Sequence, residues 1–157
     1  MSMCKLKRLF LVMILVGACG MLLTCVPMSY SGAVYPAVAY DEINRRYIAV
    51  YVKWRSGDEN RNRSRIYGVF IDSAGAPLGG EFVIAEGGDE FFCPSLAYDR
   101  DHGKFLVVWN AEAVMHAQFV NTDGTLAGPT LILSDTAEPS VGRCSSVAYD
   151  PVQGMFL

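Results

Sequence analysis

The sequence predicts an all-β chain made of repeated four-stranded antiparallel sheets, and three observations lead to this fold. A run that ends in Ala-Tyr-Asp, followed by a polar turn and a second apolar run, occurs at 36–51, 94–109 and 145–157. Aromatic and β-branched residues are frequent in these runs, as is typical of strands. No long helical periodicity follows residue 33. We therefore expect strands and turns throughout the rest of the chain.

The first copy of the repeat contains four strand-like segments in succession. The expected strands are 36–41, 47–52, 66–72 and 81–85. A polar stretch, 53–65, lies between the second strand and the third, and a turn cluster rich in glycine, 73–80, precedes the fourth. Glycine and proline clusters of this kind mark turns between strands.

The second copy repeats the same order of segments. Its expected strands are 94–99, 104–109, 114–121 and 130–134. A third copy begins near Cys144, and Leu157 falls inside what would be its second strand. Four short strands per unit, at a spacing of about 50 residues, are typical of the blades of a β-propeller.

The residue pattern of the units also resembles that of the tandem-repeat blades of uncharacterised secreted bacterial β-propeller proteins. The segments that carry the resemblance are 38–41, 66–68, 77–79, 82–84 and 105–109. The resemblance covers residues 35–157 and implies a blade architecture. It implies no set of catalytic residues, and a fold does not by itself define a function.

These observations divide the chain into four parts. We expect a signal peptide at 1–33, a first blade at 34–86, a second blade at 87–140 and the truncated start of a third at 141–157. Propellers close with about 4–8 blades. The chain is therefore expected to be a fragment of a longer reading frame, or to complete itself by association through its open blade edges.

The N-terminal segment has the pattern of a secretory signal with a signal helix. Lys5, Lys7 and Arg8 precede a long apolar run, and Ser31-Gly32-Ala33 offers small residues for cleavage after Ala33. Two alternatives remain open, namely a lipoprotein signal with lipidation of Cys19, and an uncleaved membrane anchor. Each of the three places the remainder in a secreted, periplasmic or cell-surface location, with the membrane contacted only through this segment.

The charge balance indicates which partners to expect. The chain has 13 basic and 16 acidic residues, a net charge of −3. Because three of the basic residues belong to the N-terminal signal, the exported part is more acidic still. This balance argues against nucleic acid, since phosphate binding needs a basic footprint.

Two cysteines, Cys93 and Cys144, lie in the exported part at the same place in successive units. A disulfide between them is compatible with an oxidising compartment. However, equivalent positions in neighbouring repeats are usually too far apart for the required Cα separation of about 4.4–6.8 Å. We therefore expect two buried free thiols, with the disulfide as the alternative.

Each unit ends its first strand with an aspartate, namely Asp41, Asp99 and Asp150. These residues are expected to be structural, accepting hydrogen bonds from backbone amides two residues on, with Gly103 and Gly154 in the left-handed conformation. The turns do not keep a second carboxylate from unit to unit, so no calcium site is expected. His102 and His116 are expected to be structural or solvated, and no metal, cofactor or catalytic residue is predicted.

Aromatic residues recur with the repeat, at Tyr40, Tyr98 and Tyr149, together with Tyr51 and Trp109. A row of aromatic rings can stack on sugars. We expect these rings instead to pack between neighbouring blades, where a large ring removes about 150–250 Å² from water.

One loop does not repeat, the polar stretch 53–65. Its possible ligand-facing residues are Arg55, Arg61, Arg63 and Arg65. Binding residues are often carried by loops on a rigid scaffold, although a solvated connection is the simpler interpretation.

The sequence favours a non-catalytic binding or surface-interaction module whose ligand is unknown. A glycan or a cell-surface protein is the kind of partner expected. The alternatives are a fragment of a carbohydrate-active propeller enzyme whose catalytic residues lie outside this chain, and a non-functional remnant of a truncated gene.

Overall fold

The computed structural model describes residues 32–54, 64–87, 91–111, 114–134 and 144–157. These residues form ten β-strands and no helix. The strands are β1 (Ala33–Asp41), β2 (Arg46–Trp54), β3 (Ser64–Ile71), β4 (Phe82–Glu86), β5 (Phe91–Asp99), β6 (Lys104–Ala111), β7 (Val114–Asn121), β8 (Leu126–Ile132), β9 (Tyr149–Asp150) and β10 (Met155–Phe156). The predicted signal helix lies outside the described residues. No helix capable of crossing a membrane occurs in the described ranges.

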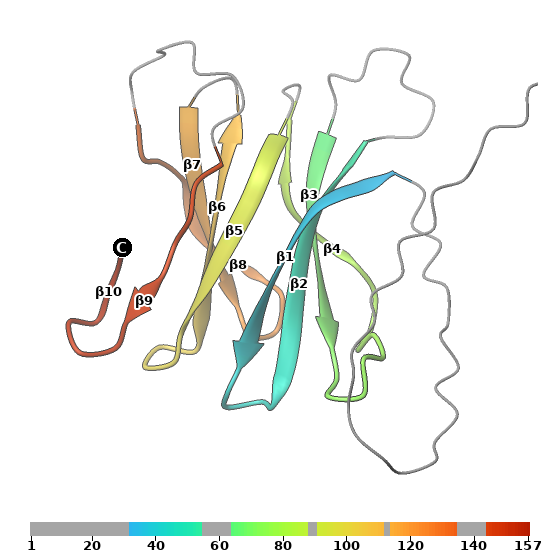
Figure 1. Ribbon diagram of the computed structural model, residues 1–157, viewed down its shortest axis with the longest axis vertical. Helices are drawn as coiled ribbons and strands as arrows, with labels where there is room; N and C mark the ends of the chain where they lie inside the picture. Colours follow the sequence, from blue (N-terminus) through green and yellow to red (C-terminus); the bar gives the residue numbers. More distant parts are fainter. Residues whose placement is uncertain (1–31, 55–63, 88–90, 112–113, 135–143) are drawn as a thin grey trace, which may run out of the picture.

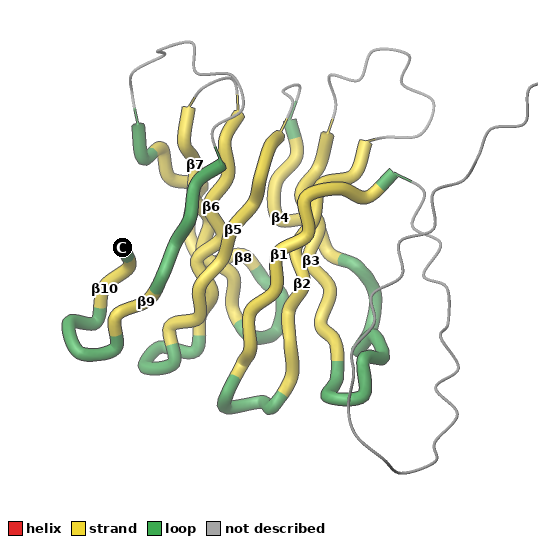
Figure 2. Tube along the Cα trace, viewed as in Figure 1, coloured by secondary structure: helices red, strands yellow, loops and turns green. Residues whose placement is uncertain are grey.

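The strands form two four-stranded antiparallel sheets and a small third one (Figures 1 and 2). The first sheet has the order β1-β2-β3-β4 and the second has the order β5-β6-β7-β8, so both are simple meanders. A hairpin of β9 and β10 follows. The all-β class and the two four-stranded sheets are therefore confirmed.

The two large sheets share local irregularities as well as strand order. β1 breaks its pairing with β2 between Val34 and Ala37, and β5 breaks its pairing with β6 between Phe92 and Ser95. At each break a non-glycine residue that precedes a proline has a positive φ, 53° at Tyr35 and 46° at Cys93. Each first strand stays paired with its second strand on both sides of the break.

The turns after the first strands are also alike. Gly103 and Gly154 have φ values of 62° and 64°, in the left-handed region as expected, and Arg45 has 54° in the first turn. Most strands differ from their expected bounds by three residues or fewer, and the start of β8 differs most. β8 begins at Leu126, before the expected 130, because it pairs with β7 on both sides of a register shift between Ala117 and Phe119.

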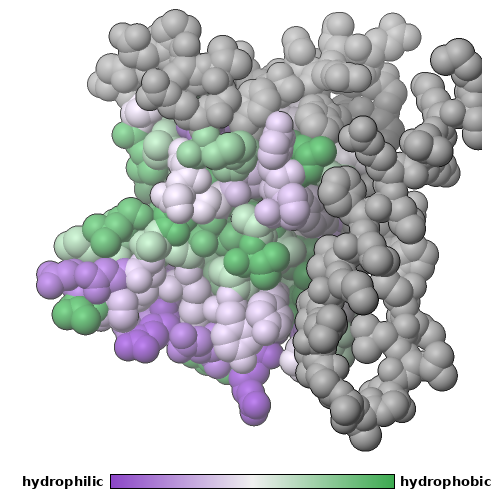
Figure 3. Space-filling view, viewed as in Figure 1, coloured by the Kyte–Doolittle hydropathy of each residue, from purple (hydrophilic) through white to green (hydrophobic). Residues whose placement is uncertain are grey.

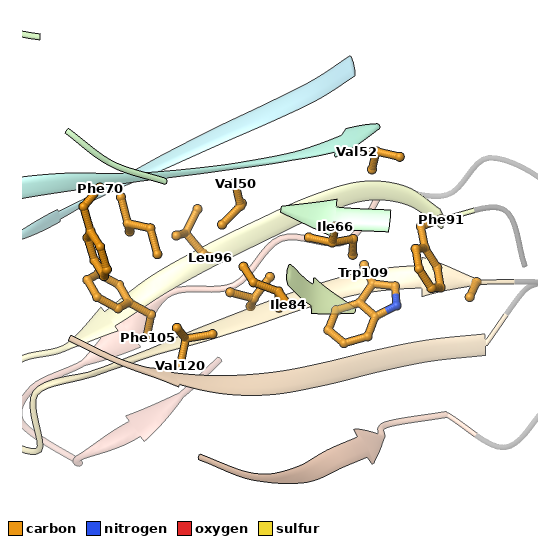
Figure 4. Close-up of a cluster of buried hydrophobic side chains, with 13 residues drawn as sticks. Val50, Val52, Ile66, Phe70, Ile84, Phe91, Leu96, Phe105, Trp109 and Val120 are labelled. Atoms are coloured by element: carbon orange, nitrogen blue, oxygen red, sulfur yellow. The ribbon is translucent and has the colours of Figure 1, made fainter. Parts of the chain in front are cut away.

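The first sheet packs face to face on the second and encloses the main core (Figure 4). The first sheet contributes Ile48, Val50, Val52, Ile66, Phe70 and Ile84, and the second contributes Phe91, Leu96, Phe105, Val107, Trp109, Ala111 and Val120. The rings of Phe70 and Phe105 are 6.3 Å apart, and those of Phe91 and Trp109 are 6.2 Å apart.

The opposite face of the second sheet meets the third hairpin. Leu106 and Val108 are buried there against Val147 and Phe156. The three units therefore follow one another in space as they do in sequence, with β1, β5 and β9 side by side (Figure 1). As a consequence, the opposite face of the first sheet is covered by no other described strand.

Candidate interaction surface

The aspartates predicted to be structural lie in the turns along one edge of the molecule. Asp41 is fully buried, and its carboxylate accepts hydrogen bonds from Asn44 N at 3.0 Å and Asn44 Nδ2 at 2.7 Å. Asp99 accepts from the backbone amides of Asp101 and His102, at 3.0 and 3.1 Å. Asp150 accepts from Val152 N at 2.8 Å. These are the contacts of Asx turns, in which the side chain replaces a backbone acceptor.

Hydrogen bonding outweighs burial at the first two carboxylates. Burial raises the pKa of Asp41, but the hydrogen bonds from Asn44, the nearby Tyr98 hydroxyl and the positive charge of Arg46 together lower it by more, so the net pKa lies below its ordinary value. At Asp99, burial again raises the pKa, and His102, Tyr149 and the turn amides bring it below its ordinary value. Both groups are thus held as carboxylates.

A tyrosine from the next unit approaches each of the first two turns. Tyr149 donates a hydrogen bond to Asp101 Oδ2 at 2.7 Å. Tyr98 faces Asp41 but its buried hydroxyl has no hydrogen bond of normal geometry. Its pKa is nevertheless raised, first by burial and then by the Asp41 carboxylate. In the second and third Ala-Tyr-Asp runs, the tyrosine therefore contacts the preceding unit, and the aspartate accepts hydrogen bonds from its own turn.

The predicted arginine loop is placed only in part. Arg55, Arg61 and Arg63 lie outside the described residues. Arg65 lies on β3, where Arg65 Nη2 is 2.7 Å from Glu86 Oε2 on β4. This ion pair joins two strands of the same sheet at the surface.

Cys93 and Cys144 form a disulfide, with Cα atoms 5.0 Å apart. The expectation of two buried free thiols is therefore wrong, and Cys93 is only half-buried while Cys144 is exposed. The physical reason is that the first strands of successive units run side by side, so equivalent positions near their starts come within the range of about 4.4–6.8 Å that a disulfide needs. Cys19, the candidate lipidation site, lies outside the described residues.

The histidines have structural contacts. His102 Nδ1 is 2.8 Å from Asp99 Oδ2, and the ring of His116 stacks on Trp109 at 5.8 Å. In the described part of the chain, no group of three His, Cys, Asp or Glu side chains is arranged to hold a metal ion.

A cleft of about 480 Å³ lies between the two large sheets on the side of β4 and β8. Trp109 and His116 line it together with Glu86 and Thr130. The indole Nε1 of Trp109 is buried without a hydrogen-bond partner among the described residues. Because one face of the indole is covered by His116 and the ring is 2% exposed, the cleft offers little aromatic surface for stacking.

Of the five aromatic residues predicted to pack between units, Tyr40 and Tyr51 do not, because both lie on the outward face of the first sheet. Tyr98 and Trp109 lie between the two sheets, and the ring of Tyr149 contacts Phe156 at 5.1 Å. Tyr40 differs, because it lies on the face of the first sheet that no other described strand covers, and it is 42% exposed. The sequence pattern placed Tyr40 between units because that pattern is the same in covered and uncovered units.

We call this surface the outer face of the first sheet. It comprises Val38, Tyr40, Tyr47, Ala49, Tyr51, Tyr67, Val69 and Ile71. The rings of Tyr40 and Tyr47 contact each other at 4.9 Å, and Val38 beside them is 58% exposed. A pocket of about 190 Å³ opens on the same face, lined mainly by apolar side chains including Ala49, Tyr51 and Val69.

A polar group borders the inner part of this face. The Lys53 ammonium lies 5.4 and 5.3 Å from the ring centres of Tyr51 and Tyr67, within the range of cation–π contacts. Lys53 also pairs with Glu81 at 2.6 Å, and Glu81 accepts a hydrogen bond from Tyr51 Oη. Burial raises the pKa of Glu81, and Lys53 and Tyr51 bring it below its ordinary value. The face is thus apolar and aromatic, with a fixed charged border at one end.

Figure 3 shows a band of hydrophobic side chains that crosses the molecule, with hydrophilic side chains gathered toward the edge that carries the aspartate turns.

Comparison with known proteins gives no match. No protein-family model, no curated protein and no solved structure is similar to this chain.

Proposed function

We propose that the chain is an exported, non-catalytic interaction module of the β-propeller type, and that it acts through the outer face of its first sheet. The observation that carries the proposal is the exposure of Val38, Tyr40 and Tyr47 on one continuous face. Contiguous exposed apolar and aromatic surface is a common mark of an interaction site. Tyrosine suits such a site because its ring buries a large area while its hydroxyl stays available for a hydrogen bond.

The blade interpretation draws support from the sheets themselves. Each is a four-stranded meander, the sheets stack face to face, and their first strands lie side by side, as blades do around an axis. The proposed export draws support from the signal-like N-terminal segment. The disulfide between Cys93 and Cys144 agrees with an oxidising compartment.

The carboxylates favour binding over catalysis as the role of the module. Asp41 and Asp99 are held by several turn hydrogen bonds each, and both have a lowered pKa. A general acid or base works best with a pKa close to the working pH. These two groups therefore serve the turns, and the outer face supplies the surface for a glycan or a cell-surface protein.

The experiment uses the full chain produced by secretion, applied to an array of glycans and purified cell-surface proteins and to a panel of glycosidase substrates. We expect binding without turnover. Tyr40→Ser and Tyr47→Ser should each weaken binding at least about tenfold, because each removes a large exposed ring from the face. Leu78→Ser is the matched control, since Leu78 is 44% exposed but lies in the turn between β3 and β4.

Two results would overturn the proposal. Turnover of any glycosidase substrate would favour the carbohydrate-active enzyme instead. If neither tyrosine substitution affects binding, the binding site lies on another surface, such as the cleft beside Trp109.

A further inference from the structure

We propose that the cleft between the two large sheets, beside β4 and β8, binds a neutral hydroxylated ligand, a monosaccharide or a short oligosaccharide. This site is separate from the outer face of the first sheet, and the two four-stranded sheets supply its described walls. Its volume of about 480 Å³ lies within the usual range of small-molecule sites, about 300–1,000 Å³. The ligand class follows from the hydrogen-bonding groups that line the cleft.

His116 presents a hydrogen-bond acceptor to the cleft. Its Nδ1 lies 3.1 Å from the carbonyl oxygen of Val114. Because a carbonyl oxygen only accepts hydrogen bonds, Nδ1 carries the proton of the neutral ring, and Nε2 keeps its lone pair. His116 is half-buried, and its ring stacks on that of Trp109 with the ring centres 5.8 Å apart, which holds the plane of the imidazole. The neutral ring therefore offers the cleft an acceptor and no second donor.

Thr130 is an acceptor for a similar reason. Its Oγ1 donates a hydrogen bond to Gln118 Oε1 at 3.0 Å. The Gln118 Nε2 donates in turn to the carbonyl oxygens of Phe119 and Gly128, at 3.1 and 3.0 Å, and Gln118 is 2% exposed, so the core fixes this arrangement. With its proton committed to Gln118, the exposed Thr130 hydroxyl turns only lone pairs toward a ligand.

Glu86 adds a third acceptor at the rim of the cleft. Its side chain is 61% exposed, and its Oε2 lies 2.7 Å from Arg65 Nη2. A carboxylate has about four lone-pair sites, so one ion pair leaves acceptor capacity for a ligand. Among the described residues that line the cleft, Glu86 is the one charged side chain, and Arg65 balances its charge.

One donor accompanies these three acceptors. The indole Nε1 of Trp109 is buried without a hydrogen-bond partner in the described part of the chain, which is an unfavourable state for a donor. Figure 4 shows this nitrogen on the side of the ring nearest to Phe91, which also lines the cleft. Because β4 and β8 each pair with one neighbour only among the described strands, a small outward shift of either strand gives a ligand access to Nε1.

Three acceptors and one donor select a ligand that donates several hydrogen bonds and also accepts one. Hydroxyl groups meet this need, because each carries one proton and two lone pairs. Neighbouring hydroxyls of one sugar would donate to the three acceptors, while another accepts from Trp109. An ammonium group also suits the acceptors, but it has no lone pair for the indole. The apolar walls, which include Ile84 and Leu126, suit the C–H groups of a sugar ring.

The test titrates the secreted full chain with neutral hexoses and their disaccharides, followed by calorimetry and by tryptophan fluorescence. The chain has two tryptophans, so Trp54→Phe leaves Trp109 as the reporter. We expect saturable binding that changes the Trp109 emission and does not depend on salt concentration, because the ligand is uncharged. A chain that binds none of these sugars at millimolar concentrations would overturn the inference.

His116→Phe tests the cleft directly, because it removes the Nε2 acceptor and keeps a ring that stacks on Trp109. It should weaken sugar binding about two- to tenfold, as expected for one lost hydrogen bond. His102→Asn is the control and should bind as the unmodified chain does, since His102 lies in the turn after β5, outside the cleft. Circular dichroism and the unfolding midpoint check that each variant is folded. Equal affinities of both histidine variants and the unmodified chain would contradict the inference.

A second probe, the diamine putrescine, tests the ligand class. Glu86→Gln keeps an acceptor oxygen, so it should change sugar binding by less than about threefold. If putrescine binds in place of the sugars, and Glu86→Gln abolishes that binding, the cleft takes cations and the inference is wrong.

Tyr40→Ser separates this inference from the proposed function. Sugar binding that is weakened by His116→Phe and kept by Tyr40→Ser supports the cleft, whatever partner the outer face of the first sheet binds. The reverse pattern would place the sugar on the outer face, so the inference would fail while the proposed function stands.

Discussion

The buried carboxylate of Asp41 shows how much a single turn residue contributes. It is fully buried at the end of β1, and its hydrogen bonds to Asn44 outweigh the desolvation that burial imposes. Its folded-state pKa lies below the unfolded value. Such a group adds stability above the unfolded pKa, and that contribution is lost as the pH falls through the folded pKa.

We expect Asp41→Asn to lower the free energy of unfolding by about 1–3 kcal/mol near neutral pH, because it leaves turn donors with a poorer acceptor. The difference from the unmodified chain should shrink as the pH falls below the ordinary aspartate range, where the carboxyl of Asp41 is protonated in both states. Urea unfolding across the acidic range measures it. Glu42→Gln is the control, since it removes a charge from the same turn at an exposed site. A difference that stays constant with pH would contradict this account.

At the scale of elements, one glycine sets the fit between β3 and β4. Gly68 pairs with Phe82 across the two strands, and a Cβ atom on Gly68 would lie 2.5 Å from Phe82 Cζ. In the second sheet the paired residues are Ala117 and Leu131. In the first sheet, glycine is thus paired with the large phenylalanine ring. In the second sheet, the larger alanine is paired with the smaller leucine side chain.

We expect Gly68→Ala to cost about 1–3 kcal/mol through overpacking. Combining it with Phe82→Leu, which reproduces the pair of the second sheet, should recover part of that loss. A double-mutant cycle by urea unfolding measures the coupling between the two positions. Strictly additive costs would show that the two side chains do not compete for the same space.

The disulfide links the start of β5 to the segment that leads into β9. It closes a separation of 51 residues. In the chain-entropy account, a loop of this length stabilises the folded state by about 4 kcal/mol relative to the open chain. We expect the double substitution Cys93→Ser and Cys144→Ser to lose about that much, measured by chemical unfolding. Reduction of the unmodified chain should give the same loss, and the double variant should no longer respond to reductant. An equal response of both proteins would show that the reductant acts elsewhere.

At the scale of the whole molecule, the two large sheets share one core. Phe105 is fully buried between them, in contact with Phe70 of the first sheet and Tyr98 of the second. Arg46 strengthens the junction, because its guanidinium lies 3.9 Å from the centre of the Phe70 ring and donates a hydrogen bond to the carbonyl of Thr122. The sheets should therefore unfold together.

We expect Phe105→Ala to cost about 3–5 kcal/mol, the usual range for a buried aromatic. Hydrogen exchange should show protection falling in β2 and β3 as well as in β6 and β7. Phe156→Ala is the control, because Phe156 packs on the opposite face of the second sheet and is only half-buried. Loss of protection confined to the second sheet would mean that the two sheets are independent units.

The local features of this chain followed from its sequence. Alternation of apolar and polar residues has the period of a strand, so the succession of eight long strands was predictable. The aspartate turns and the left-handed Gly103 and Gly154 were predictable because turn chemistry acts within a few residues. The early start of β8 was not, since it depends on pairing with β7 across a register shift.

By itself, then, the sequence determined the strand class, the order of the strands and the chemistry of the turns, because each depends on residues close together in the chain. The tertiary structure alone decided that Cys93 and Cys144 meet, because that distance depends on how the first strands of successive units run together. It alone decided that Tyr40 lies exposed while Tyr98 lies between two sheets. Both tyrosines have the same local sequence, and only the neighbouring unit that covers one and not the other makes them different.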